Sequence, residues 1–135
     1  MKNVYLFVYG TLRRDSDGAM SRWLARQADF VATGTCQGRL YRIDFYPGVV
    51  ASGSPSDRVH GEVHRLRDPE RSLARLDQYE ACGPGFEEPT EYIRQLQPVR
   101  LQSARTLTAW IYLYNLPVHE RDRIPSGDFS REPDG

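Results

Sequence analysis

Val4-Tyr-Leu-Phe-Val-Tyr-Gly-Thr-Leu-Arg-Arg14 is the stretch of sequence that decides the fold. Residues 4–9 are rich in valine, leucine and aromatic side chains, which predicts a buried or half-buried β-strand. Gly10 then allows a sharp turn without a Cβ clash, so the backbone N–H groups of Gly10, Thr11 and Leu12 can point into one concavity. Such a nest binds a carboxylate or a phosphate, and the basic pair that follows can add charge. Taken alone, however, the pattern is better explained by an ordinary turn after a strand.

Length, charge and cysteine content limit what the chain can be. Its 135 residues fit a single domain, which we expect over 1–130, with a flexible tail at 131–135. Lys+Arg and Asp+Glu both number 18. The chain therefore lacks the basic excess that is usual in nucleic-acid-binding proteins, and no nucleic-acid partner is expected. We find no apolar run of the ~20 residues that span a membrane and no signal-peptide pattern. Cys36 and Cys82 have no zinc-ligand spacing, which favours a cytoplasmic protein with two reduced thiols. The oligomeric state stays open.

The rest of the chain alternates between strand-like and helix-like patterns. Apolar spacing predicts helices over 19–28 and 68–81. The strand-like segments are 29–43 with a break at Gly38, a short strand after a Pro-Gly turn within 45–51, 59–66, and a hairpin formed by 92–101 and 104–114. The tail from residue 117 onward is polar and is expected to wrap over the surface or to be partly disordered.

The second predicted helix has clear ends. Asp68 is a suitable N-cap and Pro69 suits the first helical position. Gly83-Pro84-Gly85 is expected to end the helix.

Glu80 falls on the apolar side of this helix. Leu73, Leu76 and Glu80 are spaced i, i+3 and i+7, so the carboxylate returns to the core-facing stripe. Burial and the C-terminal end of the helix dipole should both raise its pKa, which would make it a candidate proton carrier near neutral pH. Alternatively, the last turn frays into water, or Glu80 pairs with Arg75 or Arg94. Asp77 is the rival carboxylate, and it is expected to make a local contact.

Two other patterns are weaker. His60, Glu62 and His64 alternate along a strand and share one face, which two histidines and a carboxylate could turn into a metal site. Residues two apart in a strand lie about 6.5 Å from each other, so a solvated polar face is the better interpretation and no metal is expected. The serines lack the strand-elbow-helix context of a nucleophile, and no P-loop or GxGxxG is present.

Six short motifs in order along the chain resemble a known family. They are Val8-Tyr-Gly-Thr-Leu-Arg13, Val59-His-Gly-Glu-Val63, Leu76-Asp-Gln-Tyr-Glu80, Tyr92-Ile-Arg94, Trp110-Ile-Tyr112 and Ile124-Pro-Ser-Gly-Asp-Phe129. Each motif alone is weak, but the series in this order and spacing resembles the gamma-glutamylcyclotransferase-like superfamily, most closely the branch of gamma-glutamylamine cyclotransferase. The resemblance extends from about residue 4 to residue 129.

The resemblance implies an α+β fold, a compact mixed sheet or small β-barrel flanked by a few short helices around one cavity. It implies an enzyme that releases an amine from a γ-glutamyl amine or amide and forms 5-oxoproline without a cofactor. In the family the Tyr-Gly-(Ser/Thr)-Leu turn cradles the glutamyl end of the substrate, which points here to Tyr9, Gly10, Thr11 and Leu12. The family's catalytic glutamate corresponds to Glu80, the residue that helical phase also selects.

Several further roles are expected around such a site. Tyr112 or Tyr114 would line the pocket, Arg13 would attract the substrate carboxylate or point to solvent, and Gly127-Asp128 would close the rim. The insert 82–91 could act as a lid whose glutamates, Glu87, Glu88 and Glu91, favour a cationic amine. The alternative to an enzyme is a non-catalytic protein that binds a small carboxylate in the same pocket.

Overall fold

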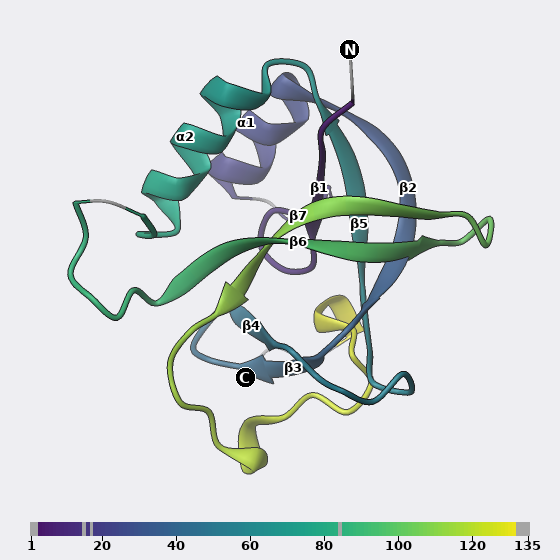
Figure 1. Ribbon diagram of the computed structural model, residues 1–135, viewed down its shortest axis with the longest axis vertical. Helices are drawn as coiled ribbons and strands as arrows, with labels where there is room; N and C mark the ends of the chain where they lie inside the picture. Colours follow the sequence, from purple (N-terminus) through teal and green to yellow (C-terminus); the bar gives the residue numbers. More distant parts are fainter. Residues whose placement is uncertain (1–2, 15, 17, 84, 132–135) are drawn as a thin grey trace.

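A computed structural model describes residues 3–14, 16, 18–83 and 85–131, and it contains a closed five-stranded barrel (Figure 1). The strands follow one another around the barrel in the order β1 (Tyr5–Val8), β5 (Arg58–Leu66), β2 (Ala28–Gln37), β6 (Tyr92–Leu101) and β7 (Thr106–Tyr114). Neighbours are antiparallel except β1 and β7, which run parallel and close the barrel where Leu6 lies opposite Trp110. The predicted small barrel in an α+β fold is therefore confirmed.

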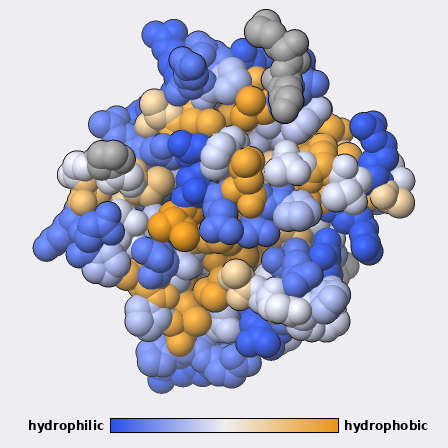
Figure 2. Space-filling view, viewed as in Figure 1, coloured by the Kyte–Doolittle hydropathy of each residue, from blue (hydrophilic) through white to orange (hydrophobic). Residues whose placement is uncertain are grey.

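Shorter elements pack around the barrel. Helices α1 (Ala19–Gln27) and α2 (Pro69–Tyr79) lie together near one end, whereas the two-stranded sheet of β3 (Arg39–Arg42) and β4 (Pro47–Val50) lies near the other (Figure 1). The 3-10 turns η1 (Glu120–Asp122) and η2 (Phe129–Arg131) belong to the C-terminal segment. No helix within the described ranges is long and apolar enough to cross a bilayer. On the face seen in Figure 2, hydrophobic residues are interspersed among hydrophilic ones.

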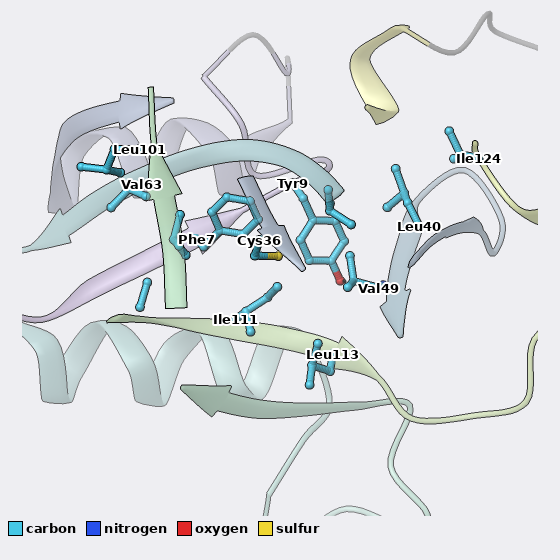
Figure 3. Close-up of a cluster of buried hydrophobic side chains, with 13 residues drawn as sticks. Phe7, Tyr9, Cys36, Leu40, Val49, Val63, Leu101, Ile111, Leu113 and Ile124 are labelled. Atoms are coloured by element: carbon cyan, nitrogen blue, oxygen red, sulfur yellow. Dashed lines mark hydrogen bonds between the residues drawn. The ribbon is translucent and has the colours of Figure 1, made fainter. Parts of the chain in front are cut away.

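Strand β1 contributes to two apolar cores because its side chains alternate between the two faces of the barrel wall. Phe7 and Tyr9 point into the barrel, where they pack with side chains from the other strands (Figure 3). Leu6 and Val8 point outward into a second core under the helices, which also contains Leu76 of α2. The turn after β1 therefore leaves the barrel wall at the boundary between both cores.

Helix α2 begins as expected but ends earlier than its glycines indicate. The Asp68 side chain accepts a hydrogen bond from the Arg71 N–H, at 3.5 Å, and Pro69 occupies the first turn. At the other end, Ala81 has a φ of 52°, and the Cys82 N–H donates to the Asp77 carbonyl at 2.9 Å. This is the left-handed C-terminal turn usually made by glycine. The helix therefore ends immediately before Glu80, and Gly83 and Gly85 lie beyond it.

Most predicted elements are confirmed to within a few residues, and one prediction is wrong. The break in the long segment 29–43 falls at Gly38, and the hairpin of β6 and β7 is present. Pro47 and Gly48 do not form a turn, because both belong to β4 and the bend lies before them, where the Ile43 N–H donates to the Tyr46 carbonyl. A Cβ on Gly48 would lie 2.7 Å from Cβ of Tyr114, so this glycine permits close packing of β4 on β7.

The C-terminal segment wraps over the barrel as far as residue 131. Its anchor is Ile124, which is buried and donates its N–H to the Leu40 carbonyl at 2.7 Å. Arg131 ends η2, and the remaining part of the predicted flexible tail, 132–135, lies outside the described residues. The assignment of 1–130 to one domain stays a prediction.

Candidate active site

A cavity of about 260 Å³ opens where the turn after β1 meets the end of α2. The turn, β4 and its approach, the end of α2, β6 and β7 all contribute to its wall. The lining residues are Phe7, Val8, Tyr9, Gly10, Thr11, Leu12, Phe45, Tyr46, Pro47, Tyr79, Glu80, Ala81, Glu91, Tyr92 and Tyr112. The wall is thus mostly apolar and aromatic, with two carboxylates.

The turn that lines this cavity contains backbone N–H groups without acceptors. The N–H groups of Gly10, Thr11 and Leu12 have no hydrogen-bond acceptor among the described residues, whereas the next N–H, that of Arg13, donates to the Gly10 carbonyl at 3.1 Å. A Cβ on Gly10 would lie 2.6 Å from Cγ of Pro47, so the turn must carry glycine to pass this close to β4. The arrangement supports the predicted nest, because buried or half-buried amides without acceptors are sites for an anion.

Glu80 lies in the same cavity without a partner. It occupies the C-cap position of α2, and its carboxylate makes no hydrogen bond or ion pair with any residue that the structure describes. Burial raises its pKa to about 7, and the negative charge of Glu91 contributes to the rise. The frayed and ion-paired alternatives are both wrong, since the last turn is closed and neither Arg75 nor Arg94 contacts Glu80.

Asp77, the rival carboxylate, is held by the protein itself. Arg94 donates to it from Nε at 2.7 Å and from Nη2 at 3.0 Å, and the Tyr112 hydroxyl donates at 2.7 Å. Burial raises the pKa of Asp77, but these hydrogen bonds outweigh burial and the pKa lies below its usual range. Asp77 therefore fastens the end of α2 to β6 and β7 one turn before Glu80.

The tyrosine hydroxyls around the cavity are largely committed to the fold. Tyr9 donates to the Tyr112 carbonyl at 2.6 Å and accepts from the Val49 N–H at 3.3 Å, with its ring inside the barrel (Figure 3). Tyr92 donates to the Pro47 carbonyl at 2.8 Å. Tyr112 lines the cavity as expected, whereas Tyr114 packs against β4 instead. The tyrosines thus shape the cavity more than they offer it polar groups.

Other predicted residues lie outside the cavity. Arg13 forms an ion pair with Asp128 at 3.0 Å, so its guanidinium contacts the C-terminal segment. Gly127 packs against β5, where its carbonyl accepts the His60 N–H at 2.8 Å. Neither Gly127 nor Asp128 lines the cavity, and the expectation that they close its rim is wrong.

The prediction that His60, Glu62 and His64 form a solvated face of β5 is wrong for two of these three residues. His60 is exposed, but Glu62 and His64 are buried, because Phe30 of β2 and the Arg14 side chain cover them. His64 Nε2 and Glu62 Oε1 are 3.2 Å apart. No group of three or more potential metal ligands is gathered within the part of the chain that the structure describes.

The insert after α2 contributes one of its three glutamates. Glu91 lines the cavity, and the Tyr46 hydroxyl donates a short hydrogen bond to it, whereas Glu87 and Glu88 are exposed and lie outside. Sequence reasoning missed the aromatic wall formed by Phe45, Tyr46 and Tyr79. Two adjacent aromatic residues just before a short buried strand were the available signal for part of it.

Comparisons with known proteins agree on one family. Residues 6–131 match the profile of the family described as gamma-glutamyl cyclotransferase, AIG2-like. The chain is 33% identical over 124 residues to the gamma-glutamylcyclotransferase family protein YtfP of Escherichia coli K12, covering 92% of this chain and 94% of that protein.

Solved structures share the fold. YkqA from Bacillus subtilis superposes with a TM-score of 0.70 at 27% identity, over 95% of this chain and 40% of that longer protein. An AIG2-like protein from Mus musculus superposes with a TM-score of 0.75 at 19% identity, over 98% of this chain and 92% of its own length. With a barrel, two helices and a cavity between the first turn and the end of α2, this chain belongs to the gamma-glutamyl cyclotransferase, AIG2-like family.

Proposed function

We propose that the protein releases an amine from a γ-glutamyl amine and forms 5-oxoproline, with Glu80 as the general base and then the general acid. Membership in the family supports a cyclotransferase. One observation carries the finer proposal: an unpartnered carboxyl with a pKa of about 7 shares a cavity with three backbone N–H groups that lack acceptors. A proton carrier near neutral pH and an anion nest are the two parts that this cyclisation needs.

The nest would bind the α-carboxylate of the glutamyl group. Tyr9, Gly10, Thr11 and Leu12 supply this part of the wall, and the backbone rather than a side chain provides the donors. Fixing the carboxylate there curls the glutamyl chain, so that its own α-amino group attacks the γ-carbonyl in an effectively intramolecular step. Tyr112 would only line the space that the chain occupies.

Glu80 would move one proton twice. The ionised carboxylate takes a proton from the α-ammonium group, and the freed amine attacks the γ-carbonyl carbon. The tetrahedral intermediate then expels the amine as its C–N bond breaks, and protonated Glu80 returns the proton to the leaving nitrogen. The ring nitrogen loses its second proton to the departing amine, so the products are 5-oxoproline and an ammonium ion, and the carboxylate is regenerated. A carboxyl with a pKa of about 7 suits both steps. The steps balance without a cofactor.

We also propose that Glu91 favours an amine that carries a second positive charge. It is the glutamate of the insert that lines the cavity, and the aromatic rings of Tyr46 and Tyr79, which line the same cavity, suit an aliphatic cation. Equal turnover of neutral and cationic γ-glutamyl amines would contradict this preference. The two buried free thiols, Cys36 and Cys82, are in keeping with a reducing compartment such as the cytoplasm.

The Glu80→Gln variant tests the assignment. Purified proteins are incubated with a panel of γ-glutamyl amines, γ-glutamyl dipeptides and glutathione, and 5-oxoproline is measured by mass spectrometry. We expect the variant to lose about 10²–10⁴-fold in turnover while it still binds the same ligands, because the amide keeps the shape of the side chain but can neither accept nor release a proton near neutral pH.

Glu87→Gln is the matched control, since this glutamate of the insert is exposed and lies outside the cavity. It should keep the wild-type rate. Unchanged turnover in Glu80→Gln would remove Glu80 from the mechanism. Ligand binding without 5-oxoproline formation by the wild type would instead favour the non-catalytic carboxylate-binding protein.

A further inference from the structure

Glu62 meets the nest-forming turn at both of its ends. Where the turn begins, Val8 is the ladder partner of Glu62 across β1 and β5. Where it ends, the Arg14 N–H donates to Glu62 Oε1 at 2.8 Å. The segment 9–13 is therefore a closed loop whose entry and exit are both fastened to one residue of the barrel wall.

The Glu62 carboxylate is buried, and its contacts are with groups of the protein itself. Only 4% of the residue is exposed, and His64 Nε2 lies 3.2 Å from Oε1 while Arg14 Nε lies 3.4 Å from Oε2. The Arg14 guanidinium also lies over the Phe30 ring, 3.3 Å from its centroid, and Phe30 meets His64 edge-on. Burial raises the pKa of Glu62, but the hydrogen bonds from His64 and the Arg14 N–H lower it further than burial raises it. The group therefore stays ionised and available as an acceptor.

The turn has further restraints between its two ends. The Arg13 N–H donates to the Gly10 carbonyl at 3.1 Å, and the Arg13 carbonyl accepts the Ser16 N–H at 2.9 Å. Leu12 is buried in the core under the helices, and the Arg13 guanidinium reaches Asp128 and the His60 carbonyl. The N–H groups of Gly10, Thr11 and Leu12 have no acceptor among the described residues, so no hydrogen bond of their own holds them. Their positions therefore depend on the Arg13–Gly10 hydrogen bond across the turn and on where the two ends of the turn are held.

We propose that Glu62 is a positioning residue for the proposed substrate site, because it fastens the exit of the turn and so aims the three N–H groups at the substrate carboxylate. This inference rests on the proposed function. The chemical class that it serves is the α-carboxylate of a γ-glutamyl compound, and Glu62 itself does not touch the substrate. A turn released at Arg14 must be ordered again each time a ligand binds, which weakens binding without altering the proton transfers at Glu80.

Glu62→Ala and Glu62→Gln test this with two measurements. The first is amide hydrogen exchange of Arg13, followed by NMR on the ligand-free protein. The Arg13 N–H bonds to Gly10 and not to Glu62, so its exchange reports whether the turn itself has loosened. We expect it to exchange about tenfold faster in Glu62→Ala, where the anchor is gone, and less so in Glu62→Gln, whose carbonyl can still accept the Arg14 N–H.

The second measurement separates KM from kcat for the best γ-glutamyl amine. We expect KM to rise about tenfold in Glu62→Ala with kcat within about twofold of the wild type, and Glu62→Gln to recover most of the difference. Asp29→Ala is the matched control, because it removes a carboxylate that pairs with Arg65 on the neighbouring strand, outside the turn. It should change neither quantity.

The outcomes separate the two proposals. Unchanged Arg13 exchange in a folded Glu62→Ala protein overturns the positioning role, and so does faster exchange with an unchanged KM. A loss of kcat at constant KM overturns it as well. If the wild type turns over no γ-glutamyl compound, the proposed function fails. The exchange measurement then still decides whether Glu62 holds the turn. If Glu62→Ala does not fold, the same two measurements on Glu62→Gln decide, and Arg13 exchange and KM that both equal the wild-type values then overturn the positioning role.

Discussion

Glu62, which is buried, and Glu80, which is half-buried, have pKa values shifted in opposite directions by their surroundings. Glu62 accepts a backbone N–H and lies against His64 and Arg14, so that its pKa falls below the usual range although burial acts against this. Glu80 has no such partners, and burial with the nearby charge of Glu91 raises its pKa to about 7. Burial raises the pKa of both carboxyls, so the presence or absence of hydrogen-bond donors decides whether the pKa ends below or above its usual range.

The difference separates a structural role from a chemical one. A carboxylate with its hydrogen bonds satisfied stabilises the fold and cannot easily exchange a proton, whereas an unsatisfied one costs stability and can. Asp77, one turn before Glu80, belongs with Glu62, because Arg94 and Tyr112 satisfy it. The protein thus supports its two site elements with satisfied acids and keeps one unsatisfied acid between them.

Glu80→Gln should give the largest change in stability of the variants that test this comparison. Because the folded pKa of Glu80 is raised from 4.5 to about 7, the folded state binds more protons than the unfolded state between these values, and wild-type stability falls as pH rises through that window. We expect the variant to be more stable than the wild type by about 3 kcal/mol at pH 8, and equally stable near pH 4. Urea unfolding at both pH values measures this, and a variant that is less stable at pH 8 would show that Glu80 has a partner in solution.

Glu62→Ala should shift stability in the opposite direction. Loss of the acceptor leaves the Arg14 N–H and His64 unsatisfied, which we expect to lower the free energy of unfolding by about 2 kcal/mol at pH 7. The pKa of Glu62 is lowered, so its ionised form stabilises the fold above the ordinary value of 4.5, and this contribution is lost as the pH falls below that value. The difference in the free energy of unfolding between the variant and the wild type should therefore become smaller as the pH falls. A difference that grows as the pH falls would contradict the assignment.

Glu91→Gln should give the smallest effect and sharpen the account of Glu80. Glu91 is the second cause of the raised pKa, after burial, so removing its charge should lower the pKa of Glu80 by up to about one unit. The rising limb of kcat/KM against pH should move to lower pH by the same amount, and any preference for cationic amines should decrease. If the limb stays where it is, burial alone sets the pKa of Glu80.

Local sequence patterns predicted the unsatisfied acid better than the satisfied one. Helical phase placed Glu80 on the same stripe as Leu73 and Leu76, and a single glycine marked the nest. Each of these signals lies within a few residues of the feature that it predicts. Glu62 was expected on a solvated face, since the alternation along β5 says which side chains share a face but not what covers that face. Phe30, far away in sequence, provides the cover.

Long-range pairs limited the other predictions in the same way. Arg13 meets Asp128, and Gly48 meets Tyr114, at separations that no local pattern reports. The end of α2 at Tyr79, two residues before the predicted end, was missed because the left-handed alanine that terminates it, Ala81, is uncommon and the glycines just beyond it are the usual signal. The order of six motifs, by contrast, indicated the barrel and its family because it samples nearly the whole chain at once.

The parallel pairing of β1 with β7 has a consequence for the order of folding. Leu6 finds its partner Trp110 only after most of the chain is available, so the closing contact has a long loop to overcome and should form late. During synthesis the turn after β1 leaves the ribosome early, yet it has no β7 beside its strand until residue 110 and its neighbours have followed. A chain interrupted before that point would carry the sequence of the nest and of Glu80 but would lack the strand that closes the barrel.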